Sequence, residues 1–159
     1  MANYLLNAEV RCFDYLLGQL GGLEGVAGYR GKWPIKTADI KEGDEVVFIE
    51  WMFRITGDGD NVADMVGPQT APRTGWLVSA ELAGRFADRD TALKFAGQLL
   101  GIAPVTLENI QQFGPAAGSV PVISDEVYRI GETGYEQDIY NVTLDMAVAF
   151  DLIDEPDIA

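Results

Sequence analysis

The sequence predicts a mainly β protein with helices, an α+β fold built on a five-stranded antiparallel barrel or curved sheet. Residues 45–56 alternate with a period of two and are rich in β-branched and aromatic side chains. Other alternating runs are separated by turn-forming glycine and acidic residues, and a helical run interrupts them. A chain of 159 residues, 48% of them hydrophobic, is long enough to bury the core of such a fold.

Residues 45–56 form the strand around which we expect the other elements to be arranged. One face of this strand is wholly apolar and carries Val47, Ile49, Trp51, Phe53 and Ile55. The other face is mixed and carries Phe48, Glu50, Met52 and Arg54. The mixed face is either a second buried layer or an exposed binding surface, and the sequence leaves both open.

An amphipathic helix is predicted over residues 4–20, and two glycines end it. Its expected core face consists of apolar residues spaced three and four apart, Leu6, Val10, Phe13, Leu17 and Leu20. The glycine-rich residues 21–28 are expected to be a flexible lead. Alternation over residues 31–40 predicts a strand that pairs with residues 45–56 in a long hairpin.

The middle of the chain predicts a long loop over residues 57–73, which should be functional or mobile. A short third strand is expected over residues 74–79, and Ser79 with Glu81 resembles a helix N-cap. The clearer helix covers residues 91–100, with Asp88 or Asp90 as its cap and Gly101 at its end. We expect it to pack through Leu93, Ala96, Leu99 and Leu100.

The last part of the chain predicts a further helical turn from Thr106 to Gly114, and then two strands, 118–130 and 141–150, joined by a turn at 131–134. Five strands with a helix between the third and fourth have the element order of an OB-type barrel, although a two-sheet sandwich has the same order. We therefore expect one β-rich domain over residues 1–150, with its β-core at 29–150, and an acidic tail over 151–159.

Composition disfavours several functions. The formal charge of −14 repels duplex nucleic acid and anionic membranes, and the chain has no histidine to serve as a base or metal ligand. Cys12 is the one cysteine, and its position predicts a small core residue. The acids at Asp58 and Asp60 suggest calcium, but Val62 occupies a ligand position, so an acidic turn is the better interpretation. We expect no catalytic residue, metal or cofactor, and a soluble, unsecreted protein with no membrane partner.

The charge is unevenly distributed. Residues 29–56 contain five basic and five acidic residues, whereas the whole chain contains 11 basic and 25 acidic ones. Aromatic rings that stack on bases, beside cations that contact phosphates, are what a single-strand-binding surface requires. The sequence therefore predicts that this hairpin binds single-stranded nucleic acid, with a core role for its aromatic residues as the alternative. The predicted contact residues are Tyr29, Arg30, Lys32, Trp33, Lys36, Phe48 and Arg54.

The C-terminal residues DLIDEPDIA resemble the acidic tips of single-stranded-DNA-binding proteins, although they end in Ala159 instead of an aromatic residue. Gly101, Gly118 and the tripeptide Tyr140-Asn141-Val142 are placed as in phage-encoded OB-type replication proteins, which the chain resembles. This resemblance implies a phage protein of the host cytoplasm that binds single-stranded DNA and uses its tail for protein partners. The acidic residues implied in those contacts are Asp151, Asp154, Glu155 and Asp157.

Two other functions fit the same sequence. A virion structural subunit of the neck, tail or capsid surface would assemble into an oligomer through a β-rich core and a long loop. An acidic inhibitor that mimics nucleic acid is a further possibility, for which the net charge is the support.

Overall fold

The computed structural model describes residues 3–21, 25–33, 48–61, 75–107, 109–130 and 135–151. Two helices and seven strands make up this part of the chain. In chain order they are α1 (Tyr4–Leu20), β1 (Ala27–Arg30), β2 (Ile49–Asn61), β3 (Gly75–Phe86), α2 (Arg89–Leu100), β4 (Val105–Leu107), β5 (Ile110–Pro115), β6 (Val122–Ile130) and β7 (Tyr135–Asp151).

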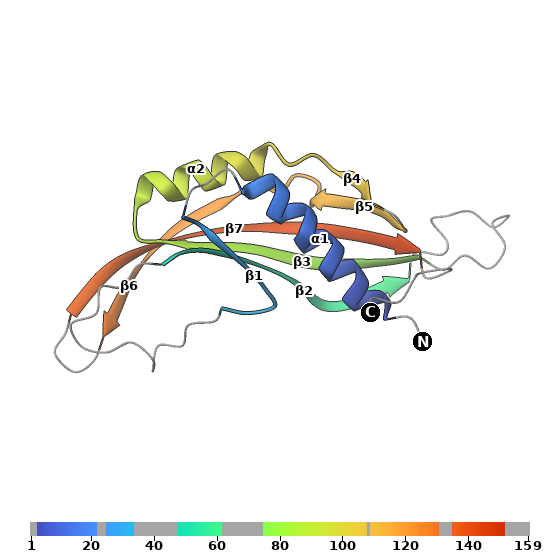
Figure 1. Cartoon of the computed structure of the whole chain (residues 1–159), viewed down its shortest axis with the longest axis horizontal. Helices are drawn as coiled ribbons and strands as arrows, with labels where there is room; N and C mark the ends of the chain where they lie inside the picture. Colours follow the sequence, from blue (N-terminus) through green and yellow to red (C-terminus); the bar gives the residue numbers. More distant parts are fainter. Residues whose placement is uncertain are drawn as a thin grey trace, which may run out of the picture.

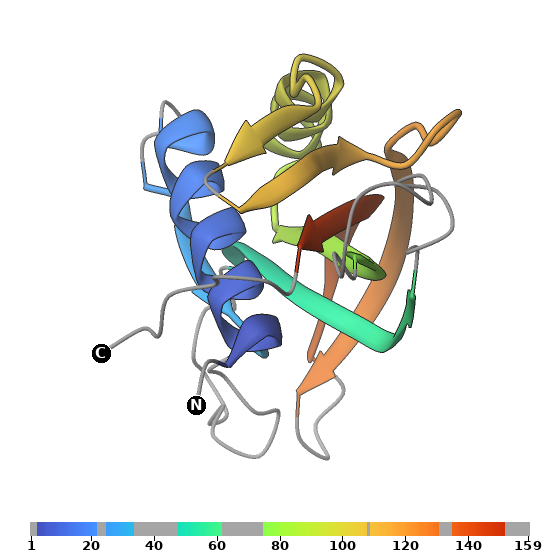
Figure 2. The ribbon, with the colours of Figure 1, turned by 90° about the vertical axis from the view of Figure 1, so that its right-hand side faces the viewer.

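All seven strands belong to one sheet with the order β1-β2-β3-β7-β5-β4, and β6 pairs with β7 beyond β5. The β1–β2 pair is parallel and the other pairs are antiparallel. Figure 2 shows that the sheet curls, with the two helices on one side of the strands. We call the face toward the helices the inner face and the opposite face the outer face.

The fold class predicted from sequence is confirmed in its main features. The protein is mainly β, its sheet is curved, one helix precedes the strands, and the second helix lies between β3 and β4. The number and direction of the strands were predicted wrongly, because the sheet has seven strands and one parallel pair. Among the described strands, β1 and β4 do not pair with each other, so the sheet is curled without being a closed barrel.

Strand β7 organises the sheet. It pairs along one edge with β3, from Tyr140 to Asp151. Its other edge pairs first with β6 and then with β5. Along that edge β6 and β5 lie end to end, and residues 116–121 connect them. In the described part of the chain, residues 135–139 of β7 pair with β6 alone. A two-stranded ribbon therefore extends past the end of β3, as Figure 1 shows.

The structure describes two parts of the predicted first hairpin: residues 48–56 lie in or next to β2, as expected, whereas residues 31–33 form no strand. Residues 27–30, expected to be flexible or to lead into the hairpin, form β1, and β1 runs parallel to β2. Gly28 explains this pairing, because a Cβ there would lie 2.4 Å from the Trp51 indole. The bare glycine lets β1 lie beside a large aromatic residue. Residues 34–47, which include most of the predicted strand 31–40 and the turn, lie outside the described residues.

Strands β2 and β3 are both longer than predicted. β2 continues to Asn61, so the predicted loop 57–73 begins in a strand, and its residues 62–73 lie outside the described part. β3 continues to Phe86, so the expected N-cap at Ser79 is wrong. Residues 79–86 keep the two-residue alternation of a strand, because Ala80, Leu82 and Phe86 are buried on the inner face.

Helix α2 agrees with the prediction in its limits and in part in its packing, since Ala96 and Leu99 are buried as expected. The Asp88 carboxylate accepts hydrogen bonds from the Thr91 N–H and hydroxyl at 3.2 and 2.9 Å, and these bonds lower the pKa of Asp88. The buried face consists of Ala92, Phe95, Ala96 and Leu99. Leu93 and Leu100, which we expected to be packed, are 41% and 67% exposed.

The predicted helical turn from Thr106 to Gly114 is a β-hairpin made of β4 and β5. Asn109 has a positive φ of 60°, a value that asparagine tolerates at turns better than most residues do. The predicted strands 118–130 and 141–150 correspond to β6 and β7, which are respectively shorter and longer than expected.

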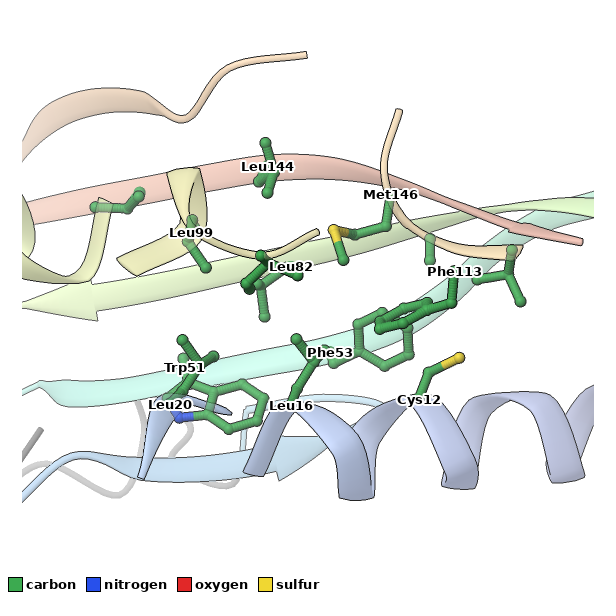
Figure 3. Close-up of a cluster of buried hydrophobic side chains, with 14 of the residues drawn as sticks. Cys12, Leu16, Leu20, Trp51, Phe53, Leu82, Leu99, Phe113, Leu144 and Met146 are labelled. Atoms are coloured by element: carbon green, nitrogen blue, oxygen red, sulfur yellow. The ribbon is translucent and has the colours of Figure 1, made fainter. Parts of the chain in front are cut away.

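The main core lies between the inner face of the sheet and the helices. Phe53 and Phe113 are fully buried there, with edge-to-face rings 5.9 Å apart. Figure 3 shows Cys12, Leu16 and Leu20 of α1 directed at the same cluster. Ala8, Cys12, Leu16 and Leu20 therefore form the core face of α1, with at most 2% of each residue exposed. The predicted core face was wrong except for Leu20 and Phe13, since Leu6 and Leu17 are exposed.

Candidate functional site

Part of the predicted nucleic-acid site is packed around Arg85 on the outer face. The Arg85 guanidinium lies 3.8 Å from the Trp33 ring centre and 4.6 Å from that of Phe48, and it is hydrogen-bonded to Glu50. Phe48 is only 3% exposed and also packs edge-to-face on Tyr128, 5.3 Å away. The prediction that Phe48 stacks on bases is therefore wrong, and one face of the Trp33 ring is already occupied.

This arrangement also decides the role of the mixed face of β2. Phe48, Glu50 and Met52 are buried, with 2% to 4% of each residue exposed, whereas Arg54 is exposed. The start of the strand thus contributes to a second buried layer. Sequence reasoning missed Arg85 because the third strand was expected to end at Ser79, which left Arg85 outside any strand.

The described cations of the predicted site are largely neutralised. Arg30 forms an ion pair with Glu9 at 2.9 Å, and Arg54 pairs with Glu81 at 2.9 Å. Lys32 is exposed beside the end of β1, and Tyr29 is half-buried. Lys36 lies outside the described residues. The predicted contact residues that the structure describes therefore do not form one exposed surface of basic and aromatic side chains.

The first residue of the predicted acidic tail, Asp151, belongs to the folded domain. Asp151 is the last residue of β7, is 8% exposed, and donates its backbone N–H to the Asn109 carbonyl at 3.1 Å. Asp151 is therefore part of the sheet and not of a free tail. Asp154, Glu155 and Asp157 lie outside the described residues.

The described residues contain no group of three or more side chains suited to hold a metal ion. Burial raises the pKa of the Cys12 thiol far above its usual value, which disfavours the thiolate that nucleophilic chemistry needs. Neither described helix is long and apolar enough to cross a membrane.

Exposed apolar side chains of the described residues are most numerous around α2 and β6, where they lie on both faces of β6, since Val122 is opposite Thr143 on the outer face and Ile123 is opposite Val142 on the inner face. Ten large apolar residues are exposed in the described part of the chain, and six of them belong to this region. We call these six residues the α2–β6 patch. They are Leu93, Leu100, Val120, Val122, Ile123 and Val127, with 38% to 67% of each exposed.

Two hollows lie along the α2–β6 patch. One, of about 300 Å³, is lined by Leu100 of α2, by Pro115 at the end of β5 and by residues that follow β5, including Pro121. The other, of about 290 Å³, is lined by Arg89 at the start of α2 and by Ile123 and Asp125 of β6. The spacing of Arg89, Leu93 and Leu100 places all three on one flank of α2. That flank therefore faces β6 at the second hollow and the connection between β5 and β6 at the first.

Strand β6 differs from the other strands in how much of it is exposed. Residues 122–127 are all exposed, so both faces of the strand are open over this length. Among the described residues, no strand pairs with its outer edge. An exposed edge with apolar side chains is a template for protein association. The alternation of β6 is visible in the sequence, but its position at an edge depends on the whole sheet.

Comparisons with protein-family models and with characterised protein sequences give no match to this chain. The proposed function therefore rests on the exposed surface of the described residues.

Proposed function

We propose that the protein is a non-enzymatic structural subunit that assembles with other copies of itself through the α2–β6 patch. The observation that supports this proposal is the gathering of six of ten exposed large apolar residues beside an unpaired strand edge in the described part of the chain. A subunit of the neck, tail or capsid surface of a virion is the class of protein that this proposal fits.

Burial of the α2–β6 patch is large enough to contribute substantially to the free energy of association. Fully burying a leucine or valine side chain contributes about 1.5–3 kcal/mol relative to leaving it exposed. Covering six half-exposed side chains therefore favours association by a free energy on the order of 5 kcal/mol, before the loss of translational freedom is counted. Backbone hydrogen bonds along the edge of β6 would add to this stabilisation.

The salt dependence of assembly follows from the net charge. Copies that each carry a charge of −14 repel one another, and added salt screens this repulsion. Self-association driven by apolar contacts should thus become stronger when salt is raised from about 20 mM to about 300 mM. Single-strand binding, the main competing proposal, should become weaker over the same range, because phosphate contacts release counterions.

The test is sedimentation velocity on the intact chain up to about 200 µM, a range that covers micromolar association, at both salt concentrations. We expect species larger than the 17.3 kDa chain, in greater proportion at high salt. A single species of 17.3 kDa under all conditions would overturn the proposal. A parallel titration with labelled oligo-dT at low salt tests the competing proposal, and a chain that remains monomeric yet binds the oligonucleotide would replace our proposal with single-strand binding.

A further inference from the structure

Strand β6 has a long unpaired edge that lacks the usual protection. Very short edge strands, irregular pairing, proline and lysine are features that keep a natural edge from pairing with another chain. β1 and β4, at the two ends of the strand order, have four and three residues. β6 has nine residues, contains no proline or lysine, and pairs with β7 from Val122 to Ile130 without a register shift. In the described part of the chain, its other edge is therefore open to a further strand.

A second copy of β6 fits this edge. A two-fold axis perpendicular to the sheet reverses the direction of the strand, so two copies run antiparallel and present the same row of N–H and C=O groups to each other. The axis also keeps the inner face of one sheet level with the inner face of the other. One residue of β6 lies on the axis opposite its own copy, and the choice of that residue sets the register of the contact.

The acids of β6 limit where the axis can lie. Asp125 and Glu126 are both exposed, and an axis at either residue would place like charges directly opposite each other, which is unfavourable. An axis at Ser124 avoids this repulsion. It pairs only residues 122–126, however, and it sets each acid against an apolar residue of the other copy.

An axis at Val127 gives the more favourable register. It extends the pairing to the last residue of β6, and the Val127 side chains, 52% exposed in one chain, lie opposite each other. Glu126 of each copy is then opposite Tyr128 of the other. Asp125 is opposite Arg129, the one basic residue of β6. No acid of one strand faces an acid of the other, so β6 is complementary in charge to a second copy of itself.

Other exposed charges lie close to β6 and oppose the contact in part. They are Asp88, Arg89, Asp90 and Lys94 of α2, and Glu136 and Asp138 of β7. The acids and bases of α2 cancel, whereas the acids of β7 add to the negative charge of the two-stranded ribbon. Two copies therefore repel each other at long range, and pairing along β6 should strengthen when salt screens this repulsion.

We propose that two copies of the chain join edge to edge along β6, antiparallel about a two-fold axis at Val127, and so form one continuous sheet. This inference rests on the proposed function and specifies how two copies meet at the β6 side of the α2–β6 patch. Both copies use the same surface, so the contact is isologous and closes at two chains. A larger assembly would need a second surface.

The first test uses single introduced cysteines. Cys12 is fully buried and burial raises the pKa of its thiol, so only the introduced cysteine reacts in the folded protein. Under mild oxidation Val127→Cys should link two chains, because opposite Cβ atoms lie about 4.5–5.5 Å apart, close to the distance that a disulfide spans. Ser124→Cys is the matched control, since it is exposed on the same strand but would lie about 20 Å from its copy. We expect at least about tenfold more linked dimer from Val127→Cys.

A second measurement does not depend on disulfide geometry. Nitroxide labels at Ser124→Cys and Val122→Cys should be separated along the strand by about 20 and about 34 Å, because each residue away from the axis adds about 7 Å. Pulsed electron paramagnetic resonance measures both distances in the assembled protein. Circular dichroism and thermal unfolding establish that each variant is folded. If Val127→Cys does not form the disulfide, these distances decide whether the edges are paired.

Assembled copies whose labels do not show this spacing would overturn edge pairing. Leu93→Lys then decides the proposed function, because Leu93 is 41% exposed on α2, within the α2–β6 patch but away from the edge of β6. If edges are unpaired and Leu93→Lys weakens assembly, the α2 side of the patch joins the copies, and the proposed function stands without the edge contact. If edges are unpaired and Leu93→Lys assembles at wild-type strength, both proposals fail. A monomeric wild-type chain overturns the proposed function itself.

Discussion

Two Arg–Glu pairs join β2 and β3 on the outer face of the sheet, and they differ in their burial. Glu50 lies opposite Arg85, and Arg54 lies opposite Glu81. The side chains of the first pair are 5% and 19% exposed, whereas those of the second are 30% and 44% exposed. The chemical groups are the same in both pairs. Any difference in their contribution to stability must therefore come from their surroundings.

The surroundings of the Glu50–Arg85 pair exclude water. The Trp33 and Phe48 rings lie 3.8 and 4.6 Å from the Arg85 guanidinium carbon. Loss of either charge there leaves the other with little water to replace its partner. Around Arg54 and Glu81 water reaches both groups, so it can replace the lost partner. One pair is thus part of a buried layer, and the other belongs to the surface.

The largest expected effect is that of Glu50→Ala. Breaking a fully buried ion pair costs about 3–5 kcal/mol because the remaining charge is uncompensated. Arg85 keeps a fifth of its side-chain surface exposed, so we expect a smaller loss in the free energy of unfolding, about 2–3 kcal/mol. Urea unfolding followed by tryptophan fluorescence measures it.

A double variant tests whether the uncompensated charge is the cause. Replacing Glu50 with Leu and Arg85 with Met removes both charges and keeps apolar volume, an exchange that is often neutral. The double variant should therefore be more stable than Glu50→Ala. A double variant that is less stable than the single one would contradict this explanation.

The second effect is that of Trp33→Ala, which removes one of the two rings around Arg85. A cation–π contact contributes about 0.5–1 kcal/mol at exposed sites and about 2 kcal/mol when desolvated. Because Trp33 is partly exposed, we expect the free energy of unfolding to fall by about 1 kcal/mol. The same substitution in an Arg85→Met background should have a smaller effect. An equal effect in both backgrounds would show that the ring acts without the cation.

The apolar face of β2 was predictable because the period of a strand is a local property of the sequence. Ile49, Trp51, Phe53 and Ile55 all pack in or against the main core, as expected. Which of Glu50 and Arg54 is buried is not a local property, since their partners lie 35 and 27 residues away on β3. With β3 expected to end at Ser79, both partners lay outside the predicted strand.

Which faces of α1 and α2 are exposed could likewise not be predicted from local sequence. The core position of Cys12 was expected and is confirmed, but two apolar stripes are present on α1, and only tertiary packing selects Ala8 and Leu16 for the core. The larger side chains of the other stripe suggested the opposite choice. Similarly, the exposure of Leu93 and Leu100 follows from how α2 lies on the sheet, which spacing within the helix does not determine.

The smallest expected effect is that of Glu81→Ala in the exposed pair. Its carboxylate lies 2.9 Å from the Arg54 guanidinium, which is good geometry, yet both side chains keep a substantial exposed surface. Exposed ion pairs contribute about 0.2–1 kcal/mol, and ordering two flexible side chains offsets part of the attraction. Removing one acid from a chain with a charge of −14 also relieves general repulsion, which opposes the loss of the pair. We therefore expect a change in the free energy of unfolding within about 0.5 kcal/mol, and a still smaller one in salt of about 0.5 M, where the pair and the repulsion are both screened. A loss of stability as large as that of Glu50→Ala would contradict this explanation. It would mean that water does not replace the lost carboxylate at the Arg54 guanidinium, although that group is exposed, so that exposure would not explain the difference between the two pairs.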